Sequence, residues 1–243
     1  MARPGLRQVT DEGGRAERLS HAAENYLLSL YVLKEEGERA TPGHLADYIR
    51  SLPATEGLGT SLPSVLGMLR RMAREGLIVI PSSKDIQFTT KGQSAAEAVV
   101  RRHRLAECMV VDLLGLPLHK AHVEAHRLEH AISHDLEELI RDRLGRPTRC
   151  PFGRPIPGSG PTPQAGRASP LSDATAGAEC IVDRVPEENP DLLEFLVDHG
   201  VMPDARITVV EAGQYRGVMV LRTEGGEVSL GYQAAARLRV RPA

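Results

Sequence analysis

Histidine and carboxylate side chains recur at helical spacing in one part of the 243-residue chain, between Val100 and Ser133. His103 and Glu107 lie four residues apart. A second run has the same kind of spacing and consists of His122, His126, Glu129 and His130. Offsets of three, four, seven and eight return to one face of an α-helix. The stretch therefore predicts two helices, each carrying a face of imidazole and carboxylate groups.

These two faces favour a metal site. Imidazole nitrogen and carboxylate oxygen together suit divalent transition metals from manganese to zinc. The neighbouring positions are apolar, so the polar faces would be buried at a cost unless something pairs them. The alternative is that the histidines are solvated or hydrogen-bonded within the protein. A zincin-type helix fits less well, because the pattern H-E-x-x-H does not occur in the chain.

The composition is that of a water-soluble globular protein, with 26% charged and 41% hydrophobic residues. A formal net charge of −2 excludes a uniformly basic nucleic-acid coat but allows a local basic patch. The three well-separated cysteines form neither a disulfide framework nor a CxxC motif, which indicates a reducing, cytoplasmic compartment. We expect no transmembrane helix and no secretory signal, because long apolar runs are lacking.

The first third of the chain predicts a winged helix-turn-helix. Residues 1–19 read as a flexible arm, and residues 20–90 predict three helices followed by a two-stranded ribbon. Ser20 and Thr41 are the expected caps of the first two helices. The connection at residues 53–61 is longer than the usual turn of this motif.

The third helix of this unit would enter the major groove of DNA. Small and polar residues stand at its start, and basic residues follow where they could neutralise phosphates. The candidate DNA contacts are Thr60, Ser61, Pro63, Ser64, Gly67, Arg70, Arg74 and, at the tip of the ribbon, Lys84. The alternative for such a unit is a helical bundle that binds another protein.

The rest of the chain divides into three parts. Residues 91–158 predict a helical unit for dimerisation and metal binding, with a long first helix ending near residue 114. Residues 159–180 are rich in Pro and Gly and predict a linker. Residues 181–243 alternate apolar and polar positions around one short helix, which predicts a small β-barrel.

In order along the chain, these parts resemble the metal-dependent repressors of the diphtheria toxin repressor, iron-dependent regulator and manganese transport regulator family. The most specific matches are His103-Arg-Leu-Ala-Glu107, Glu129-His130 and the segment PFGRPIPG that ends at Gly158. The C-terminal part resembles a FeoA-type domain. The resemblance implies a mainly α fold with a small β domain, in a homodimer that binds palindromic operator DNA when loaded with a divalent metal.

The resemblance also implies two metal sites. The first would use His103, Glu107 and His122 with an acidic residue of the C-terminal domain, which is Glu187, Glu188 or Asp191. The second would use His126, Glu129 and His130 with a residue of the first helix, which falls on Asn25.

At the second site the chain departs from both branches of the family. The iron branch has Met at the position of Asn25 and Cys at that of His126, whereas the manganese branch has carboxylates there. Because both soft sulfur donors are lost, we expect the protein to bind Mn²⁺ in preference to Fe²⁺. Zn²⁺ and Co²⁺ are also expected to bind in vitro. Cys150 and Arg154 replace the usual Ser and Asn, and Arg154 is a candidate for holding an anion near the first site.

Two other functions use the same side chains. A metalloenzyme of the hydrolase type would need an open coordination position and an activating carboxylate. A metal-storage or metal-delivery protein would need the cluster and the FeoA-type domain alone. Neither explains a recognition helix followed by a ribbon, so the sequence favours a regulator that is not an enzyme.

Overall fold

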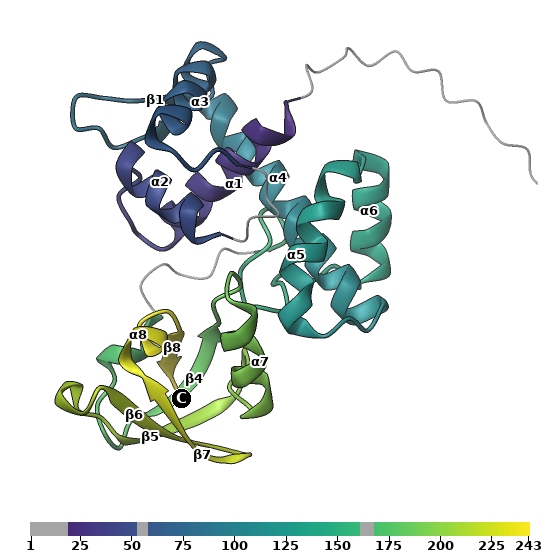
Figure 1. Ribbon diagram of the computed structural model, residues 1–243. Helices are drawn as coiled ribbons and strands as arrows, with labels where there is room; N and C mark the ends of the chain where they lie inside the picture. The colour runs from purple at the N-terminus through teal and green to yellow at the C-terminus, as the bar shows by residue number, and fades with distance from the viewer. Residues whose placement is uncertain (1–18, 53–57, 161–167) are drawn as a thin grey trace, which may run out of the picture.

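The computed structural model describes residues 19–52, 58–160 and 168–243. Three segments lie outside the described residues: most of the expected arm, residues 53–57 of the long connection, and residues 161–167. The elements of the first domain are α1 (His21–Glu35), α2 (Pro42–Ser51), α3 (Leu62–Arg74), β1 (Ile78–Val79) and β2 (Gln87–Phe88). β1 and β2 pair antiparallel, which gives the predicted winged-helix order (Figure 1).

Local sequence explains where the helices of this domain begin. The side chains of Ser20 and Thr41 each accept a hydrogen bond from a backbone N–H in the first turn, so both predicted caps are confirmed. Ser61 caps α3 in the same way. One face of each helix is apolar, and these faces meet in a separate core that includes Leu27, Leu45 and Leu69.

The second domain is helical, as predicted. Its elements are α4 (Thr90–Cys108), the π-helical turn η2 (Met109–Leu113), α5 (Leu118–Leu128), the 3₁₀ turn η3 (Glu129–Ala131) and α6 (His134–Arg143). The long first helix thus changes hydrogen bonding in its last turn, where the Leu114 N–H donates to the Met109 carbonyl at 3.2 Å. Gly115, with a φ of +70°, ends it in a conformation that favours glycine.

The C-terminal domain is a six-stranded antiparallel sheet with two helices. Its strand order is β3-β8-β4-β5-β6-β7. In chain order its elements are β3 (Ser169–Pro170), η4 (Leu171–Asp173), β4 (Glu179–Arg184), α7 (Pro190–Asp198), β5 (Arg206–Glu211), η5 (Gln214–Arg216), β6 (Val218–Thr223), β7 (Gly226–Gly231), α8 (Tyr232–Ala235) and β8 (Arg239–Pro242). Among the described residues, no helix combines the length and apolarity needed to cross a membrane.

The sheet begins earlier than the sequence predicts, inside the segment 159–180 that reads as a linker. Ser169 pairs with Val240, and the side chain of Leu171 is fully buried in the core of the sheet domain. The linker prediction is wrong here because the surrounding sequence is rich in Pro, which is typical of a linker. Pro170 is nevertheless accepted in β3, because β3 is an edge strand, where a residue without an N–H is tolerated.

One apolar core extends from the second domain into the third. Leu105 of α4, Phe152 after α6, Leu193 of α7 and Val182 of β4 all belong to it. α7 packs against α5, and the sheet lies beyond it (Figure 1). The winged-helix domain has a second core, to which Ala96 of α4 also belongs, and α1 meets α4 again in a small cluster that includes Leu28 and Val99. The sheet domain is therefore fixed to the helical domain by continuous packing.

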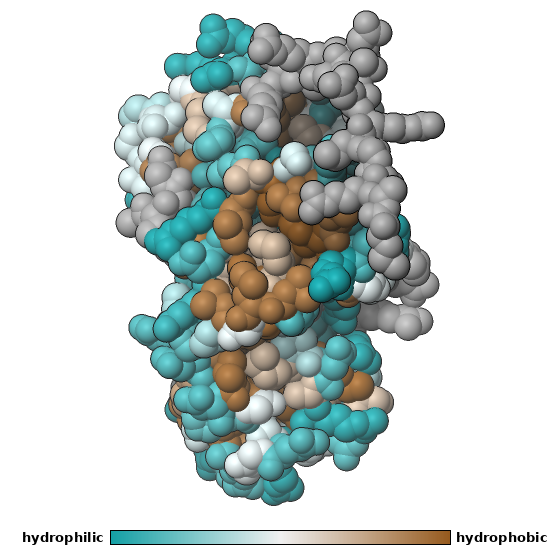
Figure 2. Space-filling model, turned by 90° about the vertical axis from the view of Figure 1, so that its right-hand side faces the viewer, coloured by the Kyte–Doolittle hydropathy of each residue, from teal (hydrophilic) through white to brown (hydrophobic). Residues whose placement is uncertain are grey.

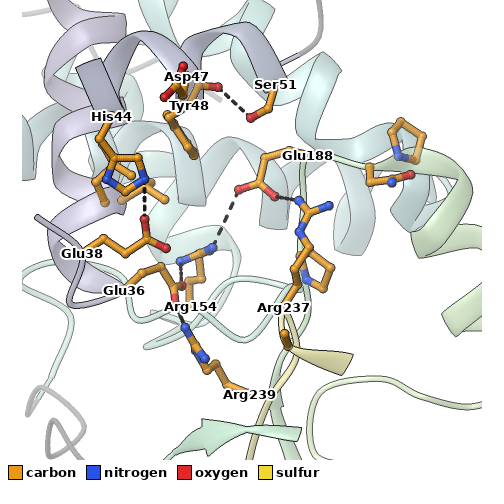
Figure 3. Close-up of a pocket in the computed structure, with 16 residues that line it drawn as sticks. Glu36, Glu38, His44, Asp47, Tyr48, Ser51, Arg154, Glu188, Arg237 and Arg239 are labelled. Carbon is orange, nitrogen blue, oxygen red and sulfur yellow. Dashed lines mark hydrogen bonds and ion pairs between the residues drawn. The ribbon is translucent and has the colours of Figure 1, made fainter. Parts of the chain in front are cut away.

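Ion pairs connect the end of α1 to the other two domains. The Glu35 carboxylate accepts hydrogen bonds from Arg104 at 2.6 and 2.9 Å and from Arg154 at 2.9 Å. Glu36 accepts from Arg154 at 2.8 Å and from Arg239 of β8 at 3.0 Å. Figure 3 shows Arg154, Glu36 and Arg239 at one side of a pocket of about 550 Å³ between the winged-helix and sheet domains.

These pairs make Glu35 a pH-sensitive part of the fold. Burial alone would raise the pKa of Glu35, but Arg104 and Arg154 outweigh it and lower the pKa to about 2. A lowered pKa stabilises the folded state above about pH 4.5, and this contribution is lost as the pH falls towards 2. The shift corresponds to roughly 3 kcal/mol at neutral pH.

We therefore expect Glu35→Gln to lower the free energy of unfolding by roughly 2–3 kcal/mol at neutral pH, and by less as the pH falls from about 5 to 3. Urea titrations at each pH measure this difference. Glu138→Gln is the matched control, because its pair with Arg141 is 3.6 Å long and only partly buried, and it should change stability by less than about 0.5 kcal/mol. A loss from Glu35→Gln that stays constant with pH would contradict the assignment.

Candidate functional site

α4 and α5 bring the predicted His and Glu residues together in the interior of the helical domain. His103 Nε2 lies 2.9 Å from Glu107 Oε1 and 3.2 Å from His122 Nδ1. The distance from His122 Nδ1 to Glu107 Oε1 is 3.3 Å. All three side chains are buried. Three ligand atoms thus converge from two helices, as the first predicted site requires.

His103 also belongs to a second group of ligand atoms. Its other nitrogen, Nδ1, lies 2.5 Å from Glu129 Oε2, and His126 Nδ1 lies 3.4 Å from Glu129 Oε1. His103, His126 and Glu129 each offer one atom within 4.8 Å of the others. The sequence predicts His130 and Asn25 in this group in place of His103. The imidazole of His103 is therefore shared between the two groups.

His130 lies at the edge of the second group and faces α1. Its Nε2 lies 3.4 Å from Glu129 Oε1, while its Nδ1 lies 2.6 Å from Glu24 Oε2. Arg102 of α4 donates to the other oxygen of Glu24 at 2.7 Å. The ring of His21 stacks on that of His130 with centroids 4.3 Å apart.

Sequence reasoning predicted that the first helix contributes to the second site, but it missed Glu24. It named Asn25, which is buried in α1, and did not name its neighbour Glu24 as a candidate residue of the site. The sequence signal that could have indicated Glu24 is the pair of polar residues Glu24 and Asn25 at the start of a helix that is otherwise largely apolar. Because Glu24 and His130 are 106 residues apart, their contact could not be read from spacing.

The cluster is strongly polarised. Burial alone would lower the pKa of His103, but Glu107 and Glu129 outweigh it and raise the pKa to about 10. Burial would raise the pKa of both carboxyls, but the neighbouring histidines, His103 above all, lower it below the usual range. The residues alone therefore hold a proton on His103 between two carboxylates. A divalent cation could replace that proton, since ligand imidazoles bind metal in the neutral form.

Among the three acidic candidates from the sheet domain, Glu187 is the one that reaches the cluster. An oxygen of its buried carboxylate lies within 4.8 Å of ligand atoms of Glu107 and Cys150. Glu188 instead accepts a hydrogen bond from Arg237 at 3.0 Å, and Asp191 is exposed at the start of α7.

Arg154 pairs within the protein and does not present a free cation to an anion. Its Nε donates to Glu187 at 3.1 Å, while its Nη1 lies against Glu35 and Glu36. The side chain is only 4% exposed. The expectation that Arg154 holds an anion near the first site is therefore wrong, because carboxylates of two other segments already neutralise it.

The residues predicted to contact DNA are all exposed in the winged-helix domain. They are Thr60, Ser61, Pro63, Ser64, Gly67, Arg70, Arg74 and Lys84. The first seven lie along or just before α3, and Lys84 lies in the ribbon. Among the described residues, no ion pair involves Arg70, Arg74 or Lys84, whereas Arg71 pairs with Glu75 at 2.7 Å. Lys84 has a φ of +60° at the tip of the ribbon. Two cationic side chains of α3 and one of the ribbon thus remain outside the ion pairs of the described residues.

A winged helix, a buried His and carboxylate cluster and a FeoA-type sheet domain together define the class of metal-responsive DNA-binding regulators. Comparisons with known proteins agree. Residues 89–158 match the iron dependent repressor, metal binding and dimerisation domain, and residues 169–242 match the FeoA domain. The chain belongs to the diphtheria toxin repressor family of metal-dependent transcriptional repressors.

Individual relatives cover between 58% and 91% of the chain. The iron-dependent repressor IdeR of Mycobacterium leprae is 35% identical over 234 residues, which are 91% of this chain and 97% of the relative. The diphtheria toxin repressor of Corynebacterium diphtheriae is 39% identical over 140 residues, 58% of each chain. A solved manganese-dependent transcriptional repressor in complex with manganese superposes with a TM-score of 0.80 at 30% identity, covering 91% of this chain and all of the other. These named repressors imply a regulator rather than an enzyme.

Proposed function

We propose that this chain is a repressor that binds palindromic operator DNA as a homodimer loaded with divalent metal, and that Mn²⁺ is preferred over Fe²⁺. The observation that carries the proposal is the contact between the buried His and Glu cluster and α1 of the DNA-binding domain. Through His130 and Glu24, a change in charge at the cluster acts directly on the winged helix. We further propose a cytoplasmic protein, since it works on DNA and its three cysteines are free.

We assign His103, Glu107, His122 and Glu187 to a first metal position, which is supported by the approach of the first three side chains to one another and of Glu187 to Glu107. We assign His126, Glu129, His130 and Asn25 to a second position, where His126 and His130 both lie 3.4 Å from Glu129 and Asn25 is proposed from its place in the first helix. Among the described residues, Glu107 Oε2 is buried and has no hydrogen-bond partner, which is the condition a bound cation would relieve. The residues present therefore fit a divalent ion.

The donor set of the second position carries the preference for Mn²⁺. Its side chains offer nitrogen and oxygen only, and hard or borderline donors do not favour iron over manganese as sulfur does. Relatives are divided, since one is named iron-dependent and another manganese-dependent. Zn²⁺ and Co²⁺ are expected to bind in vitro, because imidazole accepts both.

The bound metal would supply positive charge to the cluster, and the side chains would convert that charge into a change of conformation. His103 would bind in its neutral form and give up its proton, and Glu129 would offer the cation a carboxylate oxygen. His130 and Glu24 then set the position of α1 relative to α4, and with it the distance between the two recognition helices of a dimer. A shift from 1:99 to 99:1 between two such arrangements requires roughly 5.5 kcal/mol of differential binding.

The dimer interface is expected on the side of the helical domain where apolar side chains are exposed. Figure 2 shows a large apolar area at the centre of the face that lies to the right in Figure 1, on the side of α5 and α6. The large exposed apolar residues of this domain are Leu113, Leu114, Leu136 and Leu139. Exposed patches of this kind mark interfaces with other protein surfaces.

The metal requirement can be measured by fluorescence anisotropy with a labelled duplex selected in vitro from a randomised pool. At fixed salt, binding should appear only with metal, and Mn²⁺ should act at a lower free concentration than Fe²⁺. His130→Ala should abolish the increase in DNA binding that metal produces. The control is His134→Ala, since His134 is an exposed residue at the start of α6. DNA binding that is the same with and without each metal would overturn the proposal.

Gly67 tests the DNA-binding surface separately from the metal. A Cβ at Gly67 meets no atom within 4 Å, so Gly67→Gln should be accepted by the fold and raise stability by roughly 0.5 kcal/mol through helix propensity. Operator affinity should nevertheless fall at least about tenfold, because the new side chain occupies the approach to the groove. Gly43→Gln in α2 is the matched control, as its Cβ also meets open space. Equal operator affinity for both variants would remove Gly67 from the interface.

The dimer interface is tested by Leu139→Glu, at a side chain that is 67% exposed on α6. Burying a carboxylate in an apolar interface is strongly unfavourable, so sedimentation velocity should show a monomer at concentrations where the unmodified protein is a dimer. Tyr215→Glu, at a residue 88% exposed in the sheet domain, should leave the dimer intact. A Leu139→Glu protein that still dimerises would place the interface elsewhere.

A further inference from the structure

The guanidinium of Arg154 lies between carboxylates that come from different domains. Its Nε donates to Glu187 Oε2 at 3.1 Å. Its Nη1 donates to Glu35 at 2.9 Å and to Glu36 at 2.8 Å, where α1 ends. The side chain is 4% exposed, so these contacts are made away from bulk water. One rigid, planar group therefore joins the segment after β4 to the first helix of the winged-helix domain.

The turn that carries Arg154 is held by its backbone. The Arg154 carbonyl accepts a hydrogen bond from the Cys150 N–H at 2.8 Å. Gly153 has a φ of +88°, and a Cβ there would lie 2.2 Å from the carbonyl oxygen of Asp183 in β4. Because the turn packs so closely on the sheet, Arg154 can redistribute its contacts by moving its guanidinium but not its backbone.

Glu187 connects Arg154 to the first metal position. An oxygen of its carboxylate lies within 4.8 Å of a carboxylate oxygen of Glu107. Glu187 is 4% exposed and Glu107 is fully buried. Two carboxylates this close repel each other, and the charge of Arg154 offsets part of that repulsion. A divalent cation bound between them would offset it more strongly, and it would also repel the guanidinium.

Glu36 is where the guanidinium of Arg154 meets the sheet domain as well as α1. Glu36 Oε1 lies 2.8 Å from Arg154 and 3.6 Å from Arg184 of β4, and its Oε2 lies 2.9 Å from Arg239 of β8. Figure 3 shows Arg154 and Arg239 on either side of this carboxylate. Among these three described arginines, only Arg154 also pairs with Glu187.

We propose that Arg154 is a positioning residue that transmits the occupancy of the first metal position to the winged-helix domain. The inference rests on the proposed binding of metal at that position. Without metal, the guanidinium is divided between Glu187 and the end of α1. When Glu187 serves as a metal ligand, its pair with Arg154 weakens, and Arg154 interacts more strongly with Glu35 and Glu36. The end of α1 is then held more firmly against the turn and the sheet.

This connection is separate from the one through His130. His130 contacts Glu24 in the first turn of α1, whereas Arg154 contacts Glu35 and Glu36 at the other end of the same helix. Each metal position therefore acts on its own end of α1. Because coupling between two sites is reciprocal, a firmly held α1 also raises the affinity of the first position for metal.

Hydrogen exchange at the end of α1, followed by mass spectrometry, tests the proposal in the full-length protein with His130→Ala. That change removes the contact with Glu24, so an effect of Mn²⁺ on this helix end has to come from the first position. The reporters are the N–H groups of Glu36 and Glu38, which donate to carbonyls of α1 at 3.0 and 2.9 Å. Saturating Mn²⁺ should slow their exchange about fivefold, the lower end of usual coupling between sites.

Two variants in the same background should remove this effect of Mn²⁺. Glu36→Gln takes away the charge on which Arg154 acts. Arg154→Lys keeps a positive charge, but an ammonium is a point charge and cannot span Glu187 and α1 as the planar guanidinium does. The matched control is Glu38→Gln, which should keep the effect, because Glu38 lines the same pocket and pairs with His44 at 2.8 Å.

Bound Mn²⁺ is counted separately by electron paramagnetic resonance, in which the free ion gives a strong six-line signal. Loss of the effect in Glu36→Gln and Arg154→Lys, with retention in Glu38→Gln, would establish the coupling. If Arg154→Lys does not fold, the comparison of Glu36→Gln with Glu38→Gln decides alone.

Other outcomes overturn the inference. Mn²⁺ that binds but slows exchange equally in Glu36→Gln and Glu38→Gln, or not at all, would leave Arg154 as a structural ion pair and the metal-dependent repressor intact. The same holds if a folded Arg154→Lys keeps the effect, or if Mn²⁺ binds to the unmodified protein but not to His130→Ala. The absence of Mn²⁺ binding to the unmodified protein would overturn the proposed function as well.

Discussion

A single buried imidazole, that of His103, lies between two buried carboxylates and constrains the rest of the helical domain. Glu107 approaches one of its nitrogens at 2.9 Å and Glu129 the other at 2.5 Å. Removing three ionisable groups from water is costly unless each has its partner in good geometry. α4 must therefore meet α5 and η3 in one register. The surrounding apolar core of Leu105, Ala106 and Ala125 fixes that register by packing.

Much of the fold follows from local sequence. The caps at Ser20 and Thr41, the helical stripes and the alternating strands depend on neighbouring residues, and those patterns gave the winged helix, the helical domain and the small sheet domain. The edge strand at Ser169 and Pro170 was missed because its pairing with β8 joins residues 71 apart, such as Ser169 and Val240. Composition alone could not distinguish that strand from a linker.

The candidate site divides in the same way. Spacing along α4 and α5 was enough to collect His103, Glu107, His122, His126 and Glu129 on facing surfaces. It could not show that His103 serves both groups, since this depends on where the helices cross. Nor could spacing place Glu24 on His130, or Glu187 and Cys150 beside Glu107, because each contact joins separate elements. The exposed positions on α3 could be predicted from the helical period of its apolar residues alone.

The continuous core of the second and third domains has a consequence for cooperativity. Because α4 to α6 and the sheet share one set of buried side chains, they are expected to open and close as one unit, and the winged-helix domain with its own core as another. The His and Glu cluster lies where these two units meet at α1, next to the small contact made by Leu28 and Val99. An allosteric signal in this chain therefore has to cross the boundary between α1 and α4, where the ion pairs of Glu24 and Glu35 join the two units.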